Sequence, residues 1–362
     1  MKVHFVTRTS MGKLSGGDAV QILETKKGLE KLGITVTLGT SKEPLPPGTD
    51  LVHVFNPSQV YSSAIMDTAK AARIPVAIST IHWDMRERYR AMFGVNREFF
   101  RLKPPGYLRH YASAQVRALL YNYAWNPVMD RRLGSFLRKA DLLLPNSDAE
   151  TRVLERQFDI PPDRCSKVVN GFDATLAREA TPGKFAKQHG LTDFVLCAGR
   201  IEYRKNQLAL IEALIGFPEP LVFIGKPFDP RYTALCKELG RRRGRTLFID
   251  HLDQRDLFSA YADARVHALV SWYETPGLAS LEACAAGANL AVSRGGCTEE
   301  YFGPHAEYCD ADDVASIRAA VERAWERPKT RDGSTFVTEL YTWDTAGEQT
   351  LAAYARCAPP QP

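Results

Sequence analysis

The sequence has no hydrophobic run that approaches the ~18 residues needed for a membrane-spanning helix. Its seven cysteines include no C-x-x-C pair, so neither a zinc site nor a disulfide framework is expected, and a reducing cytoplasm is the expected compartment. Residues 1–7 form a short apolar run without the longer stretch and cleavage site of a signal peptide. Any contact with a membrane is therefore expected to be peripheral.

Two common nucleotide-binding motifs are also missing. No G-x-G-x-x-G follows a predicted strand, which argues against an NAD-dependent oxidoreductase, and no G-x-x-x-x-G-K-[ST] supports a nucleoside triphosphatase. The histidines show no metal-ligand spacing. Asp310 and Asp312 form a D-x-D, as a metal-dependent transferase requires, but a helix is predicted directly after them. We expect them to cap that helix, and we expect no metal site.

Charge is nearly balanced, with 47 Lys and Arg against 42 Asp and Glu and a formal net charge of +5. This small excess suits polyanionic partners such as nucleotides, lipid headgroups or nucleic acid, without choosing among them. Basic residues gather in residues 85–139 and 241–245. Basic runs are usually solvated faces, and the modest net charge argues against the large phosphate footprint of a nucleic-acid-binding protein.

The 362 residues exceed what one hydrophobic core normally spans, and 44% of them are hydrophobic, so two domains are expected. Short runs rich in β-branched residues alternate with stretches of helical periodicity, which is the pattern of β-α-β units in a parallel sheet. The runs are residues 3–7, 35–38, 51–55, 76–80 and 142–144, and then 194–198, 221–224, 246–249, 266–270 and 289–292. The prediction is an α/β fold of two doubly wound Rossmann-like domains facing across a cleft.

Residues 85–139 interrupt this alternation, because they contain many arginines and no strand signal. One helical face collects the apolar residues Leu108, Tyr111, Ala112, Val116, Leu119, Leu120 and Tyr123. Two interpretations stay open. The segment is either a helical elaboration packed on the first domain or a basic, aromatic docking surface for an anionic membrane or a lipid-linked acceptor.

The residues with the clearest chemistry lie between 270 and 296. A predicted strand ends at Val270, a loop with Glu274, Pro276 and Gly277 follows, and a helix-forming run begins at Leu278. The free N–H groups and the dipole of a helix N-terminus bind anions, and a residue without a Cβ lets a phosphate approach closely. The loop therefore predicts a diphosphate site.

Glu274 and Glu282 bracket this helix start. In a helix they would lie about 12 Å apart along the axis, farther than the roughly 5 to 9.5 Å between paired glycosidase carboxylates. They are better placed to hold the sugar and the ribose at opposite ends of a long ligand. The alternative is that Glu274 caps the helix and Glu282 is a solvated acid.

Gly199 and Arg200 follow the predicted strand 194–198, and Lys205 comes five residues after Arg200. Side chains beyond the carboxyl end of a parallel strand enter the ligand-binding crevice. Two cations there would neutralise a diphosphate leaving group.

Together these residues resemble the nucleotide-sugar-binding domain of the retaining glycosyltransferases of family four, which have the GT-B fold. The matching residues are Gly199, Arg200, Lys205, Asn206, the run 221–225, Glu274, Pro276, Gly277, Leu278, Leu281, Glu282, Ala283, Ala286 and Gly287. The family usually has Gly-Phe-Gly where this chain has residues 275–277, and a proline where it has Asn289.

The first half carries further resemblances. Gly16 and Gly17 are similar to the family's glycine loop, which approaches the donor phosphates or the transferring sugar, and His82 matches its histidine at the edge of the reaction centre. By this likeness, residues 1–175 form the acceptor-side domain and residues 176–340 the nucleotide-sugar-binding domain. Residues 341–362 resemble the terminal helix that crosses back to the first domain.

The resemblance implies a retaining, metal-independent hexosyltransferase that needs no cofactor. It would move a sugar from a UDP- or GDP-linked donor to a glycan or lipid-linked saccharide, in surface polysaccharide or glycolipid synthesis, in the cytoplasm or at the inner face of the membrane. Its catalytic residues would be Arg200, Lys205, Glu274 and His82, and its donor-binding residues Gly16, Gly17, Gly199, Arg200, Lys205, Glu274, Pro276, Gly277, Leu278 and Glu282. A sugar-nucleotide epimerase or a non-catalytic sugar-nucleotide binder of the same fold stays open as an alternative.

Overall fold

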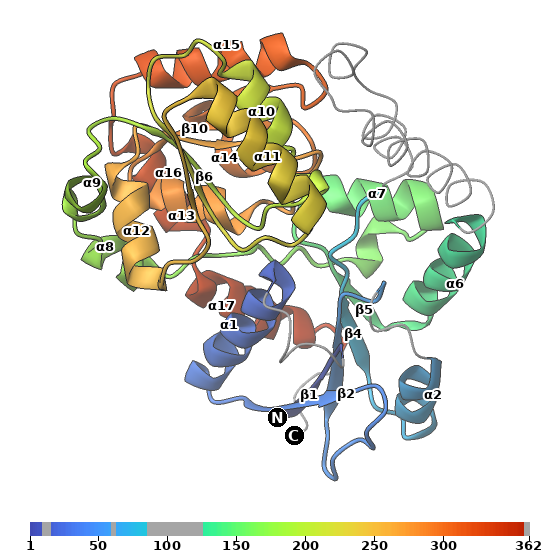
Figure 1. The fold of residues 1–362 in the computed structure, drawn as a ribbon. Helices are drawn as coiled ribbons and strands as arrows, with labels where there is room; N and C mark the ends of the chain where they lie inside the picture. Colours follow the sequence, from blue (N-terminus) through green and yellow to red (C-terminus); the bar gives the residue numbers. More distant parts are fainter. Residues whose placement is uncertain (9–15, 59–62, 85–125, 358–362) are drawn as a thin grey trace. The chain divides into compact units, whose positions relative to one another are not determined.

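A computed structural model describes residues 1–8, 16–58, 63–84 and 126–357 (Figure 1). The chain divides into two compact units. The first contains the described residues of Met1–Tyr89, Pro105–Gly171 and Trp343–Pro362, and the second contains Phe172–Thr342. In the described part of the chain, the boundaries between the units fall at residues 171/172 and 342/343.

The sheet of the first unit is parallel throughout. Its strands are β1 (Lys2–Thr7), β2 (Thr35–Thr40), β3 (Leu51–Phe55), β4 (Val76–Ser79) and β5 (Leu142–Leu144), in the spatial order β2-β1-β3-β4-β5. Every residue of β3, β4 and β5 is buried, as is typical of parallel strands covered on both faces. This is why these strands are continuous apolar runs in the sequence.

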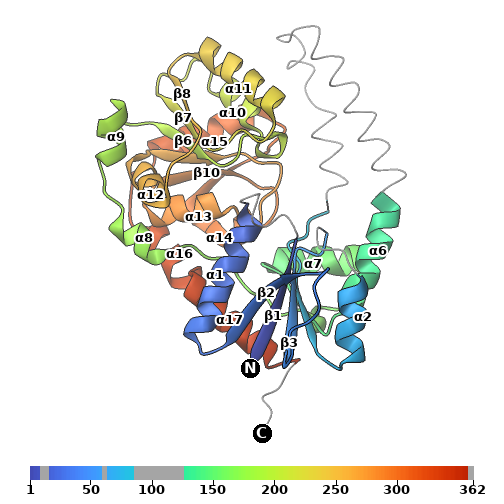
Figure 2. The same ribbon diagram turned by 60° about the horizontal axis from the view of Figure 1, so that its bottom comes forward.

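Helices cover both faces of this sheet (Figure 2). They are α1 (Gly17–Lys31) and α17 (Trp343–Tyr354) on one face, and α2 (Ser63–Ala71), α6 (Asn126–Lys139) and α7 (Asp148–Phe158) on the other. His53 of β3 lies buried between a hydrogen bond to the Tyr354 hydroxyl (2.7 Å) and one to Ser79 Oγ (2.9 Å). Burial lowers the pKa of His53 to about 3, so the neutral imidazole ties α17 to the sheet.

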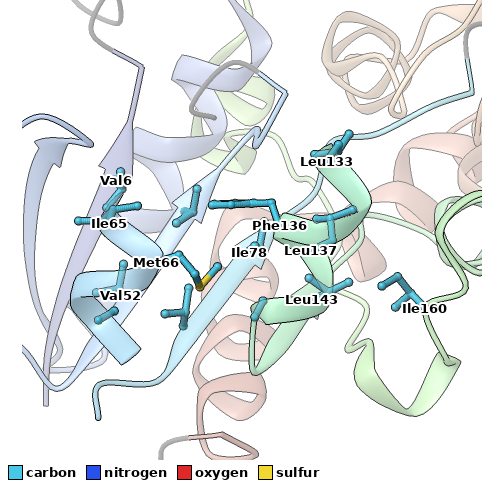
Figure 3. Close-up of a cluster of buried hydrophobic side chains, with 14 of the residues drawn as sticks. Val6, Val52, Ile65, Met66, Ile78, Leu133, Phe136, Leu137, Leu143 and Ile160 are labelled. Carbon is cyan, nitrogen blue, oxygen red and sulfur yellow. The ribbon is translucent and has the colours of Figure 1, made fainter. Parts of the chain in front are cut away.

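The core beneath α2, α6 and α7 contains Leu133, Phe136 and Leu137 of α6, packed with Met66 of α2 (Figure 3). Their spacing of three and four residues forms one apolar stripe on α6, while Arg131 and Arg132 are exposed. Residues 126–139 of the basic segment thus pack on the first unit. The rest of that segment, residues 85–125, lies outside the described residues, as does the apolar face predicted at 108–123.

The second unit has a larger parallel sheet. Its strands are β6 (Val195–Ala198), β7 (Leu221–Ile224), β8 (Thr246–Ile249), β9 (Val266–Leu269), β10 (Asn289–Ser293) and β11 (Ala306–Cys309), in the order β11-β10-β9-β6-β7-β8. Each predicted run forms a strand, but β11 was not predicted. It is four residues long and lies at the edge of the sheet with two residues partly exposed, so its sequence has no apolar run.

Figure 2 shows α10, α11 and α15 on one face of this sheet and α12, α13 and α16 on the other. The helices of the unit are α8 (Ala174–Glu179), α9 (Lys184–His189), α10 (Gln207–Ala213), α11 (Pro230–Arg243), α12 (Gln254–Asp263), α13 (Leu278–Ala285), α14 (Thr298–Phe302), α15 (Val314–Glu326) and α16 (Asp332–Leu340). Several begin at a side chain that accepts a hydrogen bond from a first-turn amide: Asp173, Asp229, Asp253 and Asp313.

The predicted cap of α15 was wrong by one residue. Asp313, not Asp310 or Asp312, accepts the hydrogen bond from the Ala315 amide. Within the described ranges, no group of three His, Cys, Asp or Glu side chains is placed to hold a metal ion. All seven cysteines are free thiols. No helix in the described part of the chain is long and apolar enough to cross a membrane.

Candidate functional site

The site in the second unit is built around the loop that joins β9 to α13. The backbone of Glu274 is fixed by residues that follow β10: its N–H donates to the Gly295 carbonyl (3.0 Å), and its carbonyl accepts from the Cys297 N–H (3.2 Å). Gly296 permits this approach, because its φ is +101° and a Cβ there would lie 2.0 Å from the Glu274 carbonyl oxygen. The loops that follow β9 and β10 therefore fix the backbone position of Glu274.

Three side chains donate hydrogen bonds to the Oε1 atom of the Glu274 carboxylate. Lys205 Nζ lies 2.6 Å from it, Ser271 Oγ 2.5 Å and Arg204 Nη1 3.3 Å. Lys205 and Glu274 are 8% and 5% exposed, so this ion pair is largely desolvated. Within the described part of the chain, the second oxygen, Oε2, accepts no hydrogen bond, which leaves it able to accept one from a ligand.

Arg204 ties the loop after β6 to the loop after β9. Its carbonyl accepts from the Trp272 N–H (2.9 Å), and its guanidinium donates to the Tyr273 carbonyl (3.1 Å) as well as to Glu274. It also pairs with Glu202 at 3.2 Å. Arg204, which was not among the predicted site residues, therefore adds a second cation to the direct ion pair between Lys205 and Glu274.

The electrostatics of this cluster keep Glu274 ionised. Burial by itself would raise the pKa of the carboxyl, but Lys205 and Arg204 beside it lower the pKa to about 2. The lowered pKa favours the ionised form of Glu274 near neutral pH. The group can act as a hydrogen-bond acceptor or as a negative charge.

Gly277, three residues after Glu274, is the N-cap residue of α13, so the helix begins where the sequence predicted. It adopts a left-handed conformation (φ +93°, ψ 85°) and has no side chain to cap the helix. The first-turn N–H groups of a helix have no partner within the helix, and they attract anions. Leu278 opens this helix, and Thr275–Pro276 before Gly277 is a cis peptide bond.

Gly199 and Arg200 lie at the carboxyl end of β6. A Cβ at Gly199 would lie 3.8 Å from Lys205 Nζ, so the glycine backbone borders the ammonium group. The Arg200 guanidinium pairs with Glu202 at 3.3 Å and stacks on the Phe228 ring at 4.6 Å, and the side chain is 36% exposed. Arg200 thus keeps a positive charge accessible to solvent, whereas the charge of Lys205 is buried.

Glu282 is not linked by a hydrogen bond or ion pair to this cluster. It lies on α13, and its Oε2 accepts a hydrogen bond from the Tyr261 hydroxyl of α12 at 3.0 Å. Burial raises the pKa of Glu282 to about 7. Glu282 is thus a helical acid of intermediate exposure, and its carboxyl is hydrogen-bonded to Tyr261.

The raised pKa of Glu282 predicts how stability changes with pH. Between its ordinary value of 4.5 and about 7, the folded protein holds a proton that the unfolded chain has lost, so stability falls as pH rises through this range. Glu282→Gln removes the free-energy cost of ionising this carboxyl in the folded protein. The variant should gain up to about 3 kcal/mol on the wild type between pH 4.5 and 8. Urea unfolding at several pH values measures it, and a gain that does not depend on pH contradicts the prediction.

The predicted site residues of the first unit are Gly16, Gly17 and His82. Gly16 precedes α1 as its N-cap residue and Gly17 opens the helix. Gln21 of α1 donates to Asn146 Oδ1 (3.2 Å), and Asn146 donates its backbone N–H to Glu150 (2.7 Å). The carboxylate of Glu150 also accepts from the His82 backbone N–H (2.7 Å).

Two residues of these networks, Arg204 and Glu150, were missed from the sequence. A signal existed for Glu150: Ser147 and Glu150 form an S-x-x-E capping box at the start of α7, and Ser147 Oγ accepts from the Glu150 N–H (3.0 Å). That motif predicts a helix start, however, and not a carboxylate that reaches back to residues 80–82. Arg204 has no motif of its own beside Lys205.

Part of the chain is similar in sequence to known glycosyltransferases. Residues 183–333 match the sequence model of the glycosyl transferases group 1. O-antigen chain mannosyltransferase B of Escherichia coli is 27% identical over 242 residues, which is 62% of this chain and 63% of that protein. Glycogen synthase of Mycobacterium tuberculosis is 34% identical over 60% of this chain and 55% of its own length. The chain spans less than two thirds of the length of these relatives.

Solved structures with the same fold match nearly the whole chain. Sucrose-phosphate synthase from Thermosynechococcus elongatus aligns with a TM-score of 0.73 at 17% identity and covers 98% of both chains. HepE of Anabaena, in complex with UDP and glucose, aligns with a TM-score of 0.71 at 16% identity over 98% of this chain and 99% of its own. The predicted fold class is confirmed, because the chain has the GT-B fold, and its residues 183–333 are similar in sequence to the glycosyl transferases group 1.

Proposed function

We propose that this protein is a retaining, metal-independent hexosyltransferase that uses a UDP- or GDP-linked sugar. The observation that carries the proposal is the Glu274 carboxylate. Its Oε1 is fixed by Lys205, Arg204 and Ser271, its Oε2 is open, and the residue lies three positions before the glycine that starts α13. A fixed acceptor for a sugar hydroxyl thus lies beside an anion-binding helix end.

Each group has a role in this reaction. The first-turn amides of α13, Arg200 and Lys205 stabilise the charge that develops on the leaving diphosphate, in place of a metal ion. Glu274 accepts hydrogen bonds from the sugar, and Glu282 from the ribose. The bond from the anomeric carbon to the diphosphate breaks while the acceptor oxygen bonds to that carbon on the same face. The acceptor's proton passes to the departing phosphate oxygen, so no further catalytic base is needed.

The first unit supplies the acceptor side in this proposal, with His82, Gly16 and Gly17 at the reaction centre. The names of the relatives support a carbohydrate or phosphorylated polyol acceptor, because they include an O-antigen mannosyltransferase, glycogen synthases and D-inositol 3-phosphate glycosyltransferases. The proposed acceptor is a glycan or lipid-linked saccharide in surface polysaccharide or glycolipid synthesis. The proposed location is the cytoplasm at the inner membrane face, with the part of the basic segment that precedes α6, residues 85–125, as the membrane contact.

A two-step experiment tests the proposal. Thermal unfolding with a panel of nucleotides and nucleotide sugars finds the donor, since a ligand at 100 times its Kd adds about 2.7 kcal/mol. NMR of the product made from that donor and a set of saccharide acceptors then gives the anomeric configuration, with and without EDTA. We expect the donor's configuration in the product and an unchanged rate in EDTA. An inverted product, an epimerised donor, binding without turnover, or loss of activity in EDTA would contradict the proposal.

A further inference from the structure

Glu150 is an unusual group for the first unit's interior, since it is a carboxylate with 0% exposure. Its Oε1 accepts from the Thr80 hydroxyl and from the His82 N–H (2.7 Å), and its Oε2 accepts from the backbone N–H (2.7 Å) and side-chain amide (3.3 Å) of Asn146. Four neutral donors thus surround it, and no ion pair involves it in the described part of the chain. A buried carboxylate is costly unless its position matters or its bonds are complete.

The segment that Glu150 holds is strained. Ile81 has a φ of +45°, a left-handed conformation that a β-branched side chain strongly disfavours. Glu150 Oε1 accepts from the residue on each side of Ile81, so one oxygen atom bridges the strained residue. Such conformations persist only when the surrounding structure enforces them, and they concentrate at functional sites.

The strained backbone at Ile81 sets the orientation of the His82 side chain. With Ile81 turned, the His82 ring packs against Phe158 (5.0 Å between centroids) and its Nε2 hydrogen-bonds Gln157 Oε1 at 2.8 Å. Glu150 and Gln157 are both on α7, two turns apart. The helix therefore fixes both the backbone and the imidazole of His82.

We infer that Glu150 is a positioning residue for sugar transfer, which sets the His82 loop through its two bonds across Ile81. The inference rests on the proposed function, because it assumes that His82 lies at the reaction centre. Glu150 itself has no exposed surface, so its effect must pass through the residues that it binds, which include Thr80 and His82. The same carboxylate reaches Asn146 and, through it, Gln21 of α1, so the helix that begins at Gly17 is tied to this network.

Glu150→Gln is the test variant, because it keeps the shape of the side chain but puts an amide NH₂ where donors converge. With the donor and acceptor of the wild-type assay, we expect kcat to fall about 100-fold, the size of effect that a misplacement of ~1 Å produces. The KM for the nucleotide sugar should stay within about twofold, because that ligand binds the second unit in our proposal. Thr80→Val removes a single donor, and about a tenfold loss of kcat is expected.

A readout independent of catalysis is deuterium exchange at the backbone amides of residues 80–84 and of Asn146. The Glu150→Gln side chain keeps one acceptor oxygen, so either the His82 N–H or the Asn146 N–H loses its acceptor, and exchange at one of these two amides should accelerate by ~10-fold or more. Ser147→Ala is the matched control. It removes the cap of α7, which bonds the Glu150 N–H, without touching residues 80–82, so we expect faster exchange only at the start of α7 and an unchanged kcat.

The outcomes separate the two claims. A wild type that transfers no sugar from any donor overturns both the proposed function and the inference. If the wild type is active, the inference falls when Glu150→Gln keeps its kcat, or when Ser147→Ala loses as much as Glu150→Gln. Should Glu150→Gln fail to fold, Thr80→Val decides alone: a wild-type kcat with faster exchange at residues 80–84 contradicts the positioning role.

Discussion

Lys205→Ala is expected to lower kcat/KM for sugar transfer by about 10³-fold, which is the upper range for losing one preorganised group that stabilises developing charge. The ammonium of Lys205 lies at the end of β6 beside the Gly199 backbone, and only 8% of the residue is exposed. A charge at such a desolvated position, where the effective dielectric constant is low, interacts strongly with a diphosphate. Removal of the ammonium leaves Glu274 paired with Arg204, so the protein should still fold.

The control for this variant is Lys237→Ala. Lys237 belongs to the same unit but pairs with Asp250 at 4.0 Å on the surface, where its side chain is 50% exposed. Its replacement should leave kcat/KM unchanged. Lys205→Arg restores the charge with a different shape and should recover only part of the activity. A Lys205→Ala enzyme within a few-fold of the wild type contradicts the assigned role.

Glu274→Gln is expected to lower the free energy of unfolding at pH 7 by about 3 kcal/mol, because it leaves two cations, Lys205 and Arg204, beside a neutral amide. The pH dependence follows from the carboxyl's depressed pKa. Its contribution is fully present above the ordinary value of 4.5 and is lost as pH falls toward about 2. The difference between wild type and variant should therefore shrink as the pH falls from 5 to 3, as urea unfolding can measure.

Glu238→Gln is the matched control for the stability prediction. Glu238 also pairs with two arginines, Arg241 at 3.0 Å and Arg242 at 2.9 Å, but on the exposed face of α11. Its loss should change the unfolding free energy by no more than about 0.5 kcal/mol. Equal effects of the two substitutions, or a Glu274 effect that is constant with pH, would contradict the claim that burial of the ion pair determines its contribution to the free energy of unfolding.

The sequence was sufficient for most of the fold, because the local patterns agree with the tertiary structure. Parallel strands buried on both faces need continuous apolar residues, so strands such as 51–55 and 221–224 can be recognised from the sequence as apolar runs. β11 escaped prediction since an edge strand needs no such run. The helix cap at Asp313 was misplaced because three aspartates within residues 310–313 are equally good caps in sequence, and only the folded geometry selects one.

Less of the candidate site was predictable. Gly277 and Glu274 lie in one contiguous motif, so their relation follows from the chain. The hydrogen bond between Tyr261 and Glu282 crosses from one helix to another, and Glu150 reaches residues about 70 positions earlier, so neither contact leaves a periodic or short-range pattern. Arg204 shows the same difficulty at close range, because only the structure reveals that both Arg204 and Lys205 bind Glu274 and that Lys205 also borders Gly199.

The most direct test of this account is calorimetric titration of the wild type with UDP, UMP, GDP and GMP. The central claim is that the turn at Gly277, with Arg200 and Lys205, binds a nucleotide diphosphate. One diphosphate should bind at least about 10-fold tighter than its monophosphate, since each charge-assisted hydrogen bond contributes about 1.5–3 kcal/mol. The gap should disappear when Arg200 and Lys205 are both replaced by alanine. Equal affinity for mono- and diphosphates in the wild type, or a gap that survives the double substitution, contradicts the claim.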